Sequence, residues 1–385
     1  MDDVKTINFD NGGKYVGQVK DDIFHGEGTY YYPNGSIYKG YWYKGQYSKY
    51  GELSYSNGSI YKGDWLEGEE FGYGELTYPN GSIYKGQWSG GKKHGYGEFT
   101  FKNGVKITGY WIKDVPTYNS LLFLNGDKYE GGLINYKRDG YGIYLYNNND
   151  IYRGLWKDDK KNCLGKFVYA NNDFYIGQYK DNLKYGIGIN KANEETYIGY
   201  FENDKRNGFG VVYDKKSRLK RVGWWKDDIF FSEEKLFQHK YKNRDIYIGE
   251  LKNNIRNGFG FYLFKDGDIS LGFWENGKLN REGILLQKEI TYIGTFKEDL
   301  LNGICLIDSK EKGLSISNFI KGHKIGYGIM DYLNGDRYEG EWNGKYYQGK
   351  GTYFEKDGEI IFAYYENSIV KETYISCFKK HAILY

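Results

Sequence analysis

Histidine and cysteine, the residues that most often carry chemistry, are few and widely separated in this sequence. The chain of 385 residues has 5 His and 3 Cys. His25 and His94 hold the same position in two copies of a 23-residue repeat that lie three copies apart, and the strand spacing puts them roughly 30 Å from each other. Cys163 and Cys305 are six copies apart, roughly 60 Å, which excludes a disulfide between them.

Cys377 and His381 form the pair whose spacing best suits metal ligands. They are four residues apart and would face one another on a terminal helix, but two ligands do not make a zinc site unless a dimer supplies two more. Gly-x-Gly pairs occur at 26–28, 72–74 and 95–97. They lie in predicted strands and recur with the repeat, so they are not phosphate-binding loops. We therefore predict no catalytic residue, no cofactor and no enzyme activity.

Composition narrows the class of protein further. Gly contributes 55 of the 385 residues, about twice the usual share, while Pro contributes only 3. The 54 basic and 51 acidic residues nearly cancel, which argues against a nucleic-acid partner. No apolar run approaches the ~18 residues of a membrane span, and the first residues lack the features of a secretory signal. We expect a cytoplasmic protein that is not secreted and has no transmembrane segment.

A repeat of 23 residues organises almost the whole chain. The heptapeptide NGSIYKG occurs at 34–40, 57–63 and 80–86. Each unit begins with a leading Tyr in the pattern Y-x-G-x-W, followed by a polar turn, then G-x-G and a later Asn-Gly. The fifteen units begin at Tyr15, Tyr38, Tyr61, Tyr84, Ile107, Tyr129, Tyr152, Tyr175, Tyr197, Arg221, Tyr247, Ser270, Tyr292, Ser315 and Tyr338.

The repeat sets the predicted boundaries. Residues 1–14 resemble half a unit and form an N-terminal cap, residues 15–360 hold the fifteen repeats, and residues 361–385 are a degenerate repeat and a C-terminal tail. The units at 107–128 and 221–246 depart from the pattern. We predict a bend or hinge at each of these two units.

Each unit has the pattern of a β-hairpin. Tyr38, Gly40 and Trp42 alternate with polar residues, which is the period of a strand with two unlike faces. A second such strand follows after a polar turn. Since one hairpin is barely stable alone, the hairpins must stack edge to edge. We predict an all-β fold, an elongated solenoid-like antiparallel sheet of about 15 stacked hairpins without a compact core. Its groove face carries the large rings packed over a column of glycines, and its outer face is the opposite one.

The unit resembles the MORN repeat (membrane occupation and recognition nexus), most clearly in YKGDWLEGEEFGYGELTYPNGSI at 61–83. The resemblance implies an extended antiparallel sheet of stacked hairpins. The chain is similar to the MORN-only proteins of protists, which are scaffolds at cortical and budding structures of the cytoskeleton. It therefore implies a location at the cytoskeleton or the membrane-associated cortex, and protein partners there.

Lysines and glutamates alternate on the outer face of the N-terminal units. Lys39, Lys62 and Lys85 follow the leading Tyr of three successive units and form what we call the lysine ladder. The matching positions of the second strands carry Glu52, Glu75 and Glu98. This arrangement predicts cross-strand charge pairs on a solvated face. The lysine ladder is also a candidate site for acidic lipid headgroups or a partner, although the glutamates would largely cancel the attraction.

The same outer-face position becomes apolar in the C-terminal units. This apolar column consists of Ile176, Ile198, Val222, Ile248, Leu271, Ile293 and Ile316. Its second-strand counterparts are Ile143, Ile189, Val211, Phe261, Ile284, Leu306 and Ile329. An exposed sheet face this apolar would aggregate, so something must cover it. We predict that a second copy of the chain does, with the tail at 368–385, curling of the sheet on itself, or another partner as the alternatives.

These observations together predict a non-enzymatic scaffold or adaptor. It would form an elongated homodimer through its C-terminal repeats and organise cytoskeletal or membrane-cortex assemblies through its repeat surface. The alternative is a peripheral membrane module that binds acidic phospholipids such as phosphoinositides.

Overall fold

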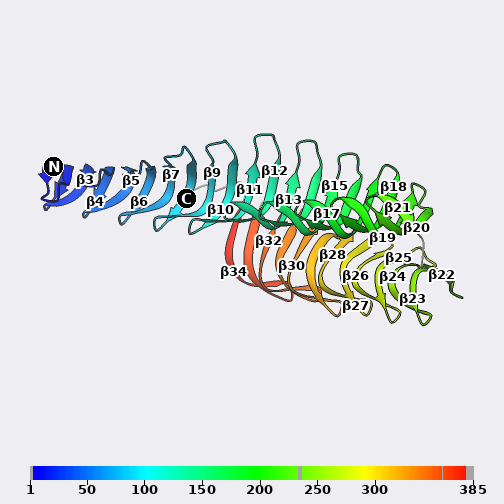
Figure 1. Cartoon of the computed structure of the whole chain (residues 1–385). Coiled ribbons are helices and arrows are strands. Elements are labelled where there is room, and N and C mark those ends of the chain that lie inside the picture. Colours follow the sequence, from blue (N-terminus) through cyan, green and yellow to red (C-terminus); the bar gives the residue numbers. More distant parts are fainter. Residues whose placement is uncertain (1–2, 233–235, 358, 379–385) are drawn as a thin grey trace. The chain divides into compact units, whose positions relative to one another are not determined.

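The computed structural model describes residues 3–232, 236–357 and 359–378, with side chains at these positions except 3, 117–119 and 375–378. Every regular element in this part of the chain is a β-strand, as Figure 1 shows. Strands pair antiparallel with their neighbours in sequence, so the predicted all-β stack of hairpins is confirmed. The chain divides into two compact units: unit 1 is residues 1–139 with 144–147, and unit 2 is residues 140–143 with 148–385.

Unit 1 is a stack of hairpins in which each strand from β1 to β12 hydrogen-bonds to the next. Strand β13 (Lys137–Leu145) contributes residues to both units. The strands of unit 1 are β1 (Asp3–Asn8), β2 (Lys14–Lys20), β3 (Ile23–Tyr31), β4 (Ile37–Tyr43), β5 (Gln46–Ser54), β6 (Ile60–Leu66), β7 (Glu69–Thr77), β8 (Ile83–Ser89), β9 (Lys92–Thr100), β10 (Lys106–Ile112), β11 (Val115–Leu122) and β12 (Lys128–Ile134).

The leading Tyr and the glycines form one packed device in each regular unit. Tyr38 is fully buried, and its hydroxyl donates a hydrogen bond to the backbone oxygen of Tyr41 over 3.1 Å. Its ring lies over Gly40 and Gly51, which pair across two strands. The indole of Trp42 packs edge-on against this ring at 5.2 Å between centroids. The predicted groove face, with rings over a glycine column, is thereby confirmed.

This geometry makes the mid-strand glycines intolerant of any side chain. A Cβ at Gly63 would lie 2.5 Å from the Cα of Gly74 and 2.6 Å from the hydroxyl of Tyr61. Because one of these neighbours is backbone, it cannot rotate away. We expect the Gly63→Ala substitution to lower the free energy of unfolding by about 1–3 kcal/mol. Urea unfolding followed by circular dichroism measures the change, and Ser89→Ala at an exposed strand end is the control. An equal midpoint for both variants would contradict the packing argument.

Unit 2 contains two separate runs of paired strands. The first run is β14 (Ile151–Lys157), β15 (Lys160–Val168), β16 (Phe174–Lys180), β17 (Leu183–Ala192), β18 (Glu195–Glu202), β19 (Lys205–Asp214), β20 (Leu219–Lys226) and β21 (Ile229–Ser232). The second is a 13-stranded sheet of β22 (Phe237–Lys240), β23 (Ile246–Lys252), β24 (Ile255–Leu263), β25 (Ile269–Glu275), β26 (Lys278–Gln287), β27 (Ile290–Lys297), β28 (Leu300–Ser309), β29 (Gly313–Ile320), β30 (His323–Tyr332), β31 (Arg337–Asn343), β32 (Tyr346–Phe354), β33 (Glu359–Glu366) and β34 (Ile369–Phe378).

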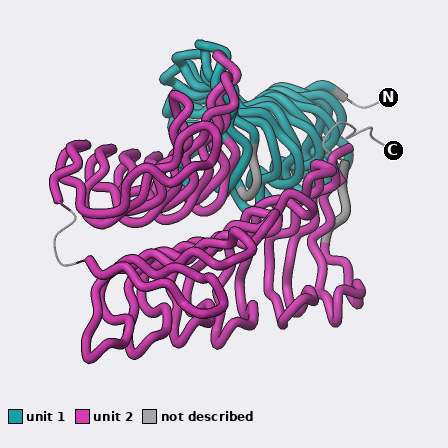
Figure 2. Tube along the Cα trace, turned by 90° about the vertical axis from the view of Figure 1, so that its right-hand side faces the viewer, with its two compact units in different colours: residues 1–139, 144–147 teal, residues 140–143, 148–385 magenta. Residues whose placement is uncertain are grey.

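These two sheets pack face to face as two layers, drawn in magenta in Figure 2. Strand β19 contacts β24, β17 contacts β26, and β15 contacts β28, so the second sheet runs back along the first. The irregular unit at 221–246 coincides with the change from one sheet to the other. The irregular unit at 107–128, in contrast, does not coincide with a change of sheet. There β10 still pairs with both β9 and β11, with one register shift beside Trp111.

A core of apolar side chains fills the space between the two layers. It contains most of the apolar column and its counterparts, with Ile293, Leu306 and Ile284 fully buried. The expectation of a sheet without a compact core is therefore wrong for unit 2. The apolar face is covered by the chain's own second sheet, which is the alternative of curling rather than a second copy.

Charged side chains of the two layers meet at the edge of this core. Arg153 Nε lies 3.2 Å from a carboxylate oxygen of Asp331, and the buried hydroxyl of Tyr141 donates to the same oxygen over 3.0 Å. Burial raises the pKa of Tyr141 well above its ordinary value, so this phenol stays a donor at neutral pH. Lys166 and Asp308 form a second link across the layers, 2.6 Å long. These contacts fix the register between sheets that apolar packing alone would leave free to slide.

Candidate binding surfaces

The lysine ladder lies where the sequence predicts, on the exposed outer face of unit 1. Lys62 Nζ is 3.1 Å from Glu52, and Lys85 Nζ is 2.9 Å from Glu75. Lys39 stands opposite Glu52 in the strand register. Hydrogen bonding to the glutamates raises the pKa of Lys62 and of Lys85, which keeps both ammonium groups charged. Lys62 and Lys85 are therefore each matched by an anion, and little net charge remains on this part of the surface.

A column of tyrosines runs beside the lysine ladder on the same face, and the sequence analysis missed it. Tyr50, Tyr73 and Tyr96, which we call the tyrosine column, are twelve residues after the leading Tyr of three successive units. Tyr50 is 63% and Tyr73 is 52% exposed, while Tyr96 is half-buried beside the ring of Tyr110. Their 23-residue spacing would have allowed their prediction from the sequence. With 44 Tyr in the chain, however, this one set does not stand out from the other tyrosines.

The same repeat position has a different environment in the first sheet of unit 2. There it holds Tyr141, Leu164, Ile187 and Phe209, and all four are buried in the core between the layers. The position that the first sheet of unit 2 uses for internal packing is thus left exposed as tyrosine in unit 1. Exposed aromatic rings with polar tips are typical of surfaces that bind proteins.

The apolar column lies inside unit 2 and not on its surface. Six of its seven members are buried, and Ile248 is partly buried against the same core. This placement corrects the expectation that these residues wait for a second copy of the chain. The physical reason is that the change of sheet at 221–246 allows one half of the column to cover the other.

On the groove face, one variable residue lies beside the leading residue of the unit, and in several units it packs against the leading Tyr ring. It is the ninth residue after the leading one, and we call it the stacking position. In the first unit the ring of Phe24 stacks on the ring of Tyr15, with 3.9 Å between the ring centroids. In unit 2 the Lys184 ammonium lies 5.1 Å from the centroid of the Tyr175 ring. The stacking positions hold Phe24, Tyr47, Glu70, Lys93, Pro116, Arg138, Lys161, Lys184, Arg206, Phe230, Arg256, Leu279, Leu301, Lys324 and Tyr347.

The residues considered for metal or redox chemistry are not brought together in the part of the chain that the structure describes. Cys163 and Cys305 are free thiols, and burial raises the pKa of Cys305 to about 11. Among the described residues, no group of three His, Cys, Asp or Glu could hold a metal ion. The pair Cys377 and His381 lies outside the described side chains. No described helix is long and apolar enough to cross a membrane.

A family model of the MORN repeat matches eight segments of the chain: 15–37, 61–83, 84–106, 129–151, 152–174, 197–216, 247–269 and 338–358. The chain is a MORN-repeat protein. The matched segments fall on the predicted units and on the observed hairpins, so the resemblance is confirmed. MORN repeats are non-catalytic and form modules that bind proteins or associate with membranes. No curated protein sequence matches this MORN-repeat protein.

Solved structures share only distant likeness with the MORN-repeat protein. The wild-type TCP10 domain of Danio rerio CPAP is 11% identical, with 57% of this chain and 100% of that chain covered and a TM-score of 0.31. The SAS-4 (dCPAP) TCP domain of Drosophila melanogaster, in complex with a proline-rich motif of Ana2 (dSTIL), is 14% identical, covers 57% of this chain and 88% of its own, and has a TM-score of 0.23. These TM-scores are too low to support an argument about fold or function.

Proposed function

We propose that this MORN-repeat protein is a non-enzymatic scaffold that binds proteins of the cytoskeleton or the cell cortex through the outer face of unit 1. The tyrosine column carries this proposal, because exposed aromatic rings remain at the position that the first sheet of unit 2 buries in the core between the layers. Regular spacing lets one extended partner, or several partners in order, contact successive units.

The alternative is a peripheral module that binds acidic phospholipids through the lysine ladder. Its attraction to an anionic surface depends on net positive charge, since each basic residue near the membrane contributes about 1 kcal/mol. Here Lys62 and Lys85 are paired with glutamates at 3.1 and 2.9 Å, so little net charge remains. The paired charges favour a protein partner over a lipid surface.

The predicted homodimer is not part of this proposal. Its interface was expected at the apolar column, and those side chains lie between the two sheets of one chain.

Proximity labelling in the cell of origin tests the scaffold proposal. We expect the combined variant Tyr50→Ala, Tyr73→Ala and Tyr96→Ala to lose a set of labelled cytoskeletal or cortical proteins. The matched control replaces Tyr31, Tyr43 and Tyr346 by alanine, three exposed tyrosines outside the column, and should keep that set. The purified chain should bind vesicles containing phosphatidylinositol bisphosphate only weakly and lose that binding at high salt. An unchanged labelled set would contradict the scaffold proposal. Vesicle binding that survives high salt, and that is lost in the variant Lys39→Glu, Lys62→Glu and Lys85→Glu, would favour the lipid module instead.

A further inference from the structure

Four units lack the leading Tyr, and in three of them an apolar side chain fills the place of its ring. In the fifth unit Ile107 is itself fully buried there. In the tenth, a Cβ at Gly223 would lie 2.9 Å from the ring of Phe230, which occupies the stacking position. In the twelfth, Leu279 at the stacking position comes within 2.9 Å of a Cβ at Gly283. The glycine columns of these units are thus covered without a tyrosine.

The fourth of these units, at residues 315–337, is filled differently. Ser315 replaces the Tyr, Ser317 replaces the following Gly, and the stacking position holds Lys324. The Lys324 ammonium donates to the Ser315 hydroxyl over 2.9 Å and lies 3.8 Å from the centroid of the Trp342 ring. A thin alkyl chain and two hydroxyl groups therefore stand where other units place a packed aromatic or branched side chain.

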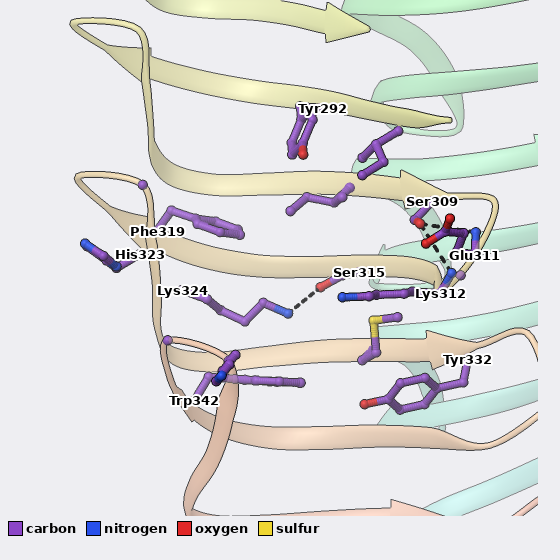
Figure 3. A pocket seen from close by; sticks show the side chains of 17 residues that line it. Tyr292, Ser309, Glu311, Lys312, Ser315, Phe319, His323, Lys324, Tyr332 and Trp342 are labelled. Atoms are coloured by element: carbon purple, nitrogen blue, oxygen red, sulfur yellow. Dashed lines mark hydrogen bonds between the residues drawn. The ribbon is translucent and has the colours of Figure 1, made fainter. Parts of the chain in front are cut away.

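A cavity of about 860 Å³ lies beside this position on the groove face of unit 2. Figure 3 shows Phe319, Trp342 and Tyr332 around it, with Lys324 extending toward Ser315. Aromatic and aliphatic side chains line the cavity, and Ser315 and Lys324 contribute hydroxyl and ammonium donors to it. The volume lies within the range of small-molecule sites.

The ammonium of Lys324 is a cation without an acidic partner in the described part of the chain, where no carboxylate is paired with it. Burial, together with the nearby Lys312 cation, lowers the pKa of Lys324 to about 8. The exposed charged groups around the cavity are those of Glu311, Lys312 and Lys345, with His323 beside them. The balance of charge therefore favours an anion, and Ser315 engages only one of the three N–H bonds of the ammonium.

We propose that this cavity binds a ligand that combines a phenyl-sized ring with a carboxylate, the ring lying in the cavity against the aromatic side chains that line it and the carboxylate accepting a hydrogen bond from Lys324. A free aromatic acid and a tyrosine flanked by acidic residues in a peptide share this chemistry. The site is on the groove face of unit 2 and does not involve the tyrosine column of unit 1.

Ligand-detected NMR on the full chain tests the proposal with three probes. The first is 4-hydroxyphenylacetate, the second is the peptide acetyl-Asp-Tyr-Asp-amide, and the third is neutral 4-methylphenol. We expect at least one of the two acids to bind in the millimolar range or tighter, and 4-methylphenol to bind more weakly. The tighter of the two acids identifies the source of the ligand. Absence of binding by both acids at 10-fold higher concentration, roughly 10 mM, would overturn the proposal.

Two variants localise the binding. The combined variant Ser315→Tyr and Ser317→Gly rebuilds the arrangement of the unit that begins at Tyr175, where a lysine also holds the stacking position. It should fold at least as well as the wild type and lose binding of every probe. Lys324→Met should weaken binding of the acids roughly tenfold and leave 4-methylphenol unchanged, whereas Lys321→Met, outside the cavity, should change neither. Binding of the acids that persists in the refilled variant, or that ignores Lys324→Met, would place the ligand elsewhere and contradict the proposal.

Discussion

The Ile293→Asp substitution is expected to separate the two layers of unit 2. Ile293 is fully buried in the core between them, so the change removes about 2–3 kcal/mol of apolar burial. It also places an unpaired carboxylate in an apolar environment. The combined loss, on the order of 5 kcal/mol or more, is comparable to the whole stability of an ordinary domain. Hydrogen exchange should show β14–β20 and β24–β30 losing protection while β2–β8 of unit 1 keep theirs.

The control for this variant is Ile320→Asp at the end of strand β29, in the same sheet. Ile320 is 50% exposed, so its replacement should change hydrogen exchange and thermal stability little. Binding of a hydrophobic dye should rise for the buried substitution and not for the exposed one. Equal behaviour of the two variants would mean that the apolar column is not covered by the second sheet.

Among substitutions that remove a charged side chain, we expect Asp331→Ala to lower the free energy of unfolding most. Asp331 accepts a hydrogen bond from Tyr141 and pairs with Arg153 across the two layers. Without it, the buried phenol of Tyr141 has no acceptor and the guanidinium of Arg153, which is 36% exposed, loses its carboxylate partner; the combined cost is about 2–3 kcal/mol. Chemical unfolding of the full chain measures the loss.

Glu52→Ala provides the matched surface comparison. It removes the partner of Lys62 from a pair whose side chains are 51% and 42% exposed, and should cost less than about 1 kcal/mol. The Asp331→Asn variant keeps an acceptor for Tyr141 and should lie between the two. A similar small loss for both alanine variants would show that the cross-layer contact does not stabilise unit 2.

Much of the fold could be predicted because the repeat imposes local rules. The period of two along Tyr38, Gly40 and Trp42 assigns each side chain to a face, and the structure places these residues as expected. What covers the apolar column could not be read in this way. Periodicity tells which side chains share a face, but a second copy and a distant part of the same chain offer the same apolar surface.

The binding surfaces were harder to predict for two different physical reasons. The tyrosine column consists of a residue type that is common throughout the chain, so only its exposure distinguishes it. The cavity beside Ser315 lies in a unit that lacks the leading ring, but the other three such units place an apolar side chain there, so the missing Tyr alone does not predict a cavity. Whether Lys324 fills the space depends on the path of its side chain, which the sequence does not contain.

The face-to-face packing of unit 2 also determines which faces of its two sheets are turned outward. Because the outer faces meet in the core, strand alternation turns the two groove faces away from each other. Unit 2 thus presents two groove faces on opposite sides of its two layers. The second sheet runs back along the first, so their unit order is reversed. An extended segment that followed one groove face from low to high unit number would meet the other groove face only in the opposite polarity.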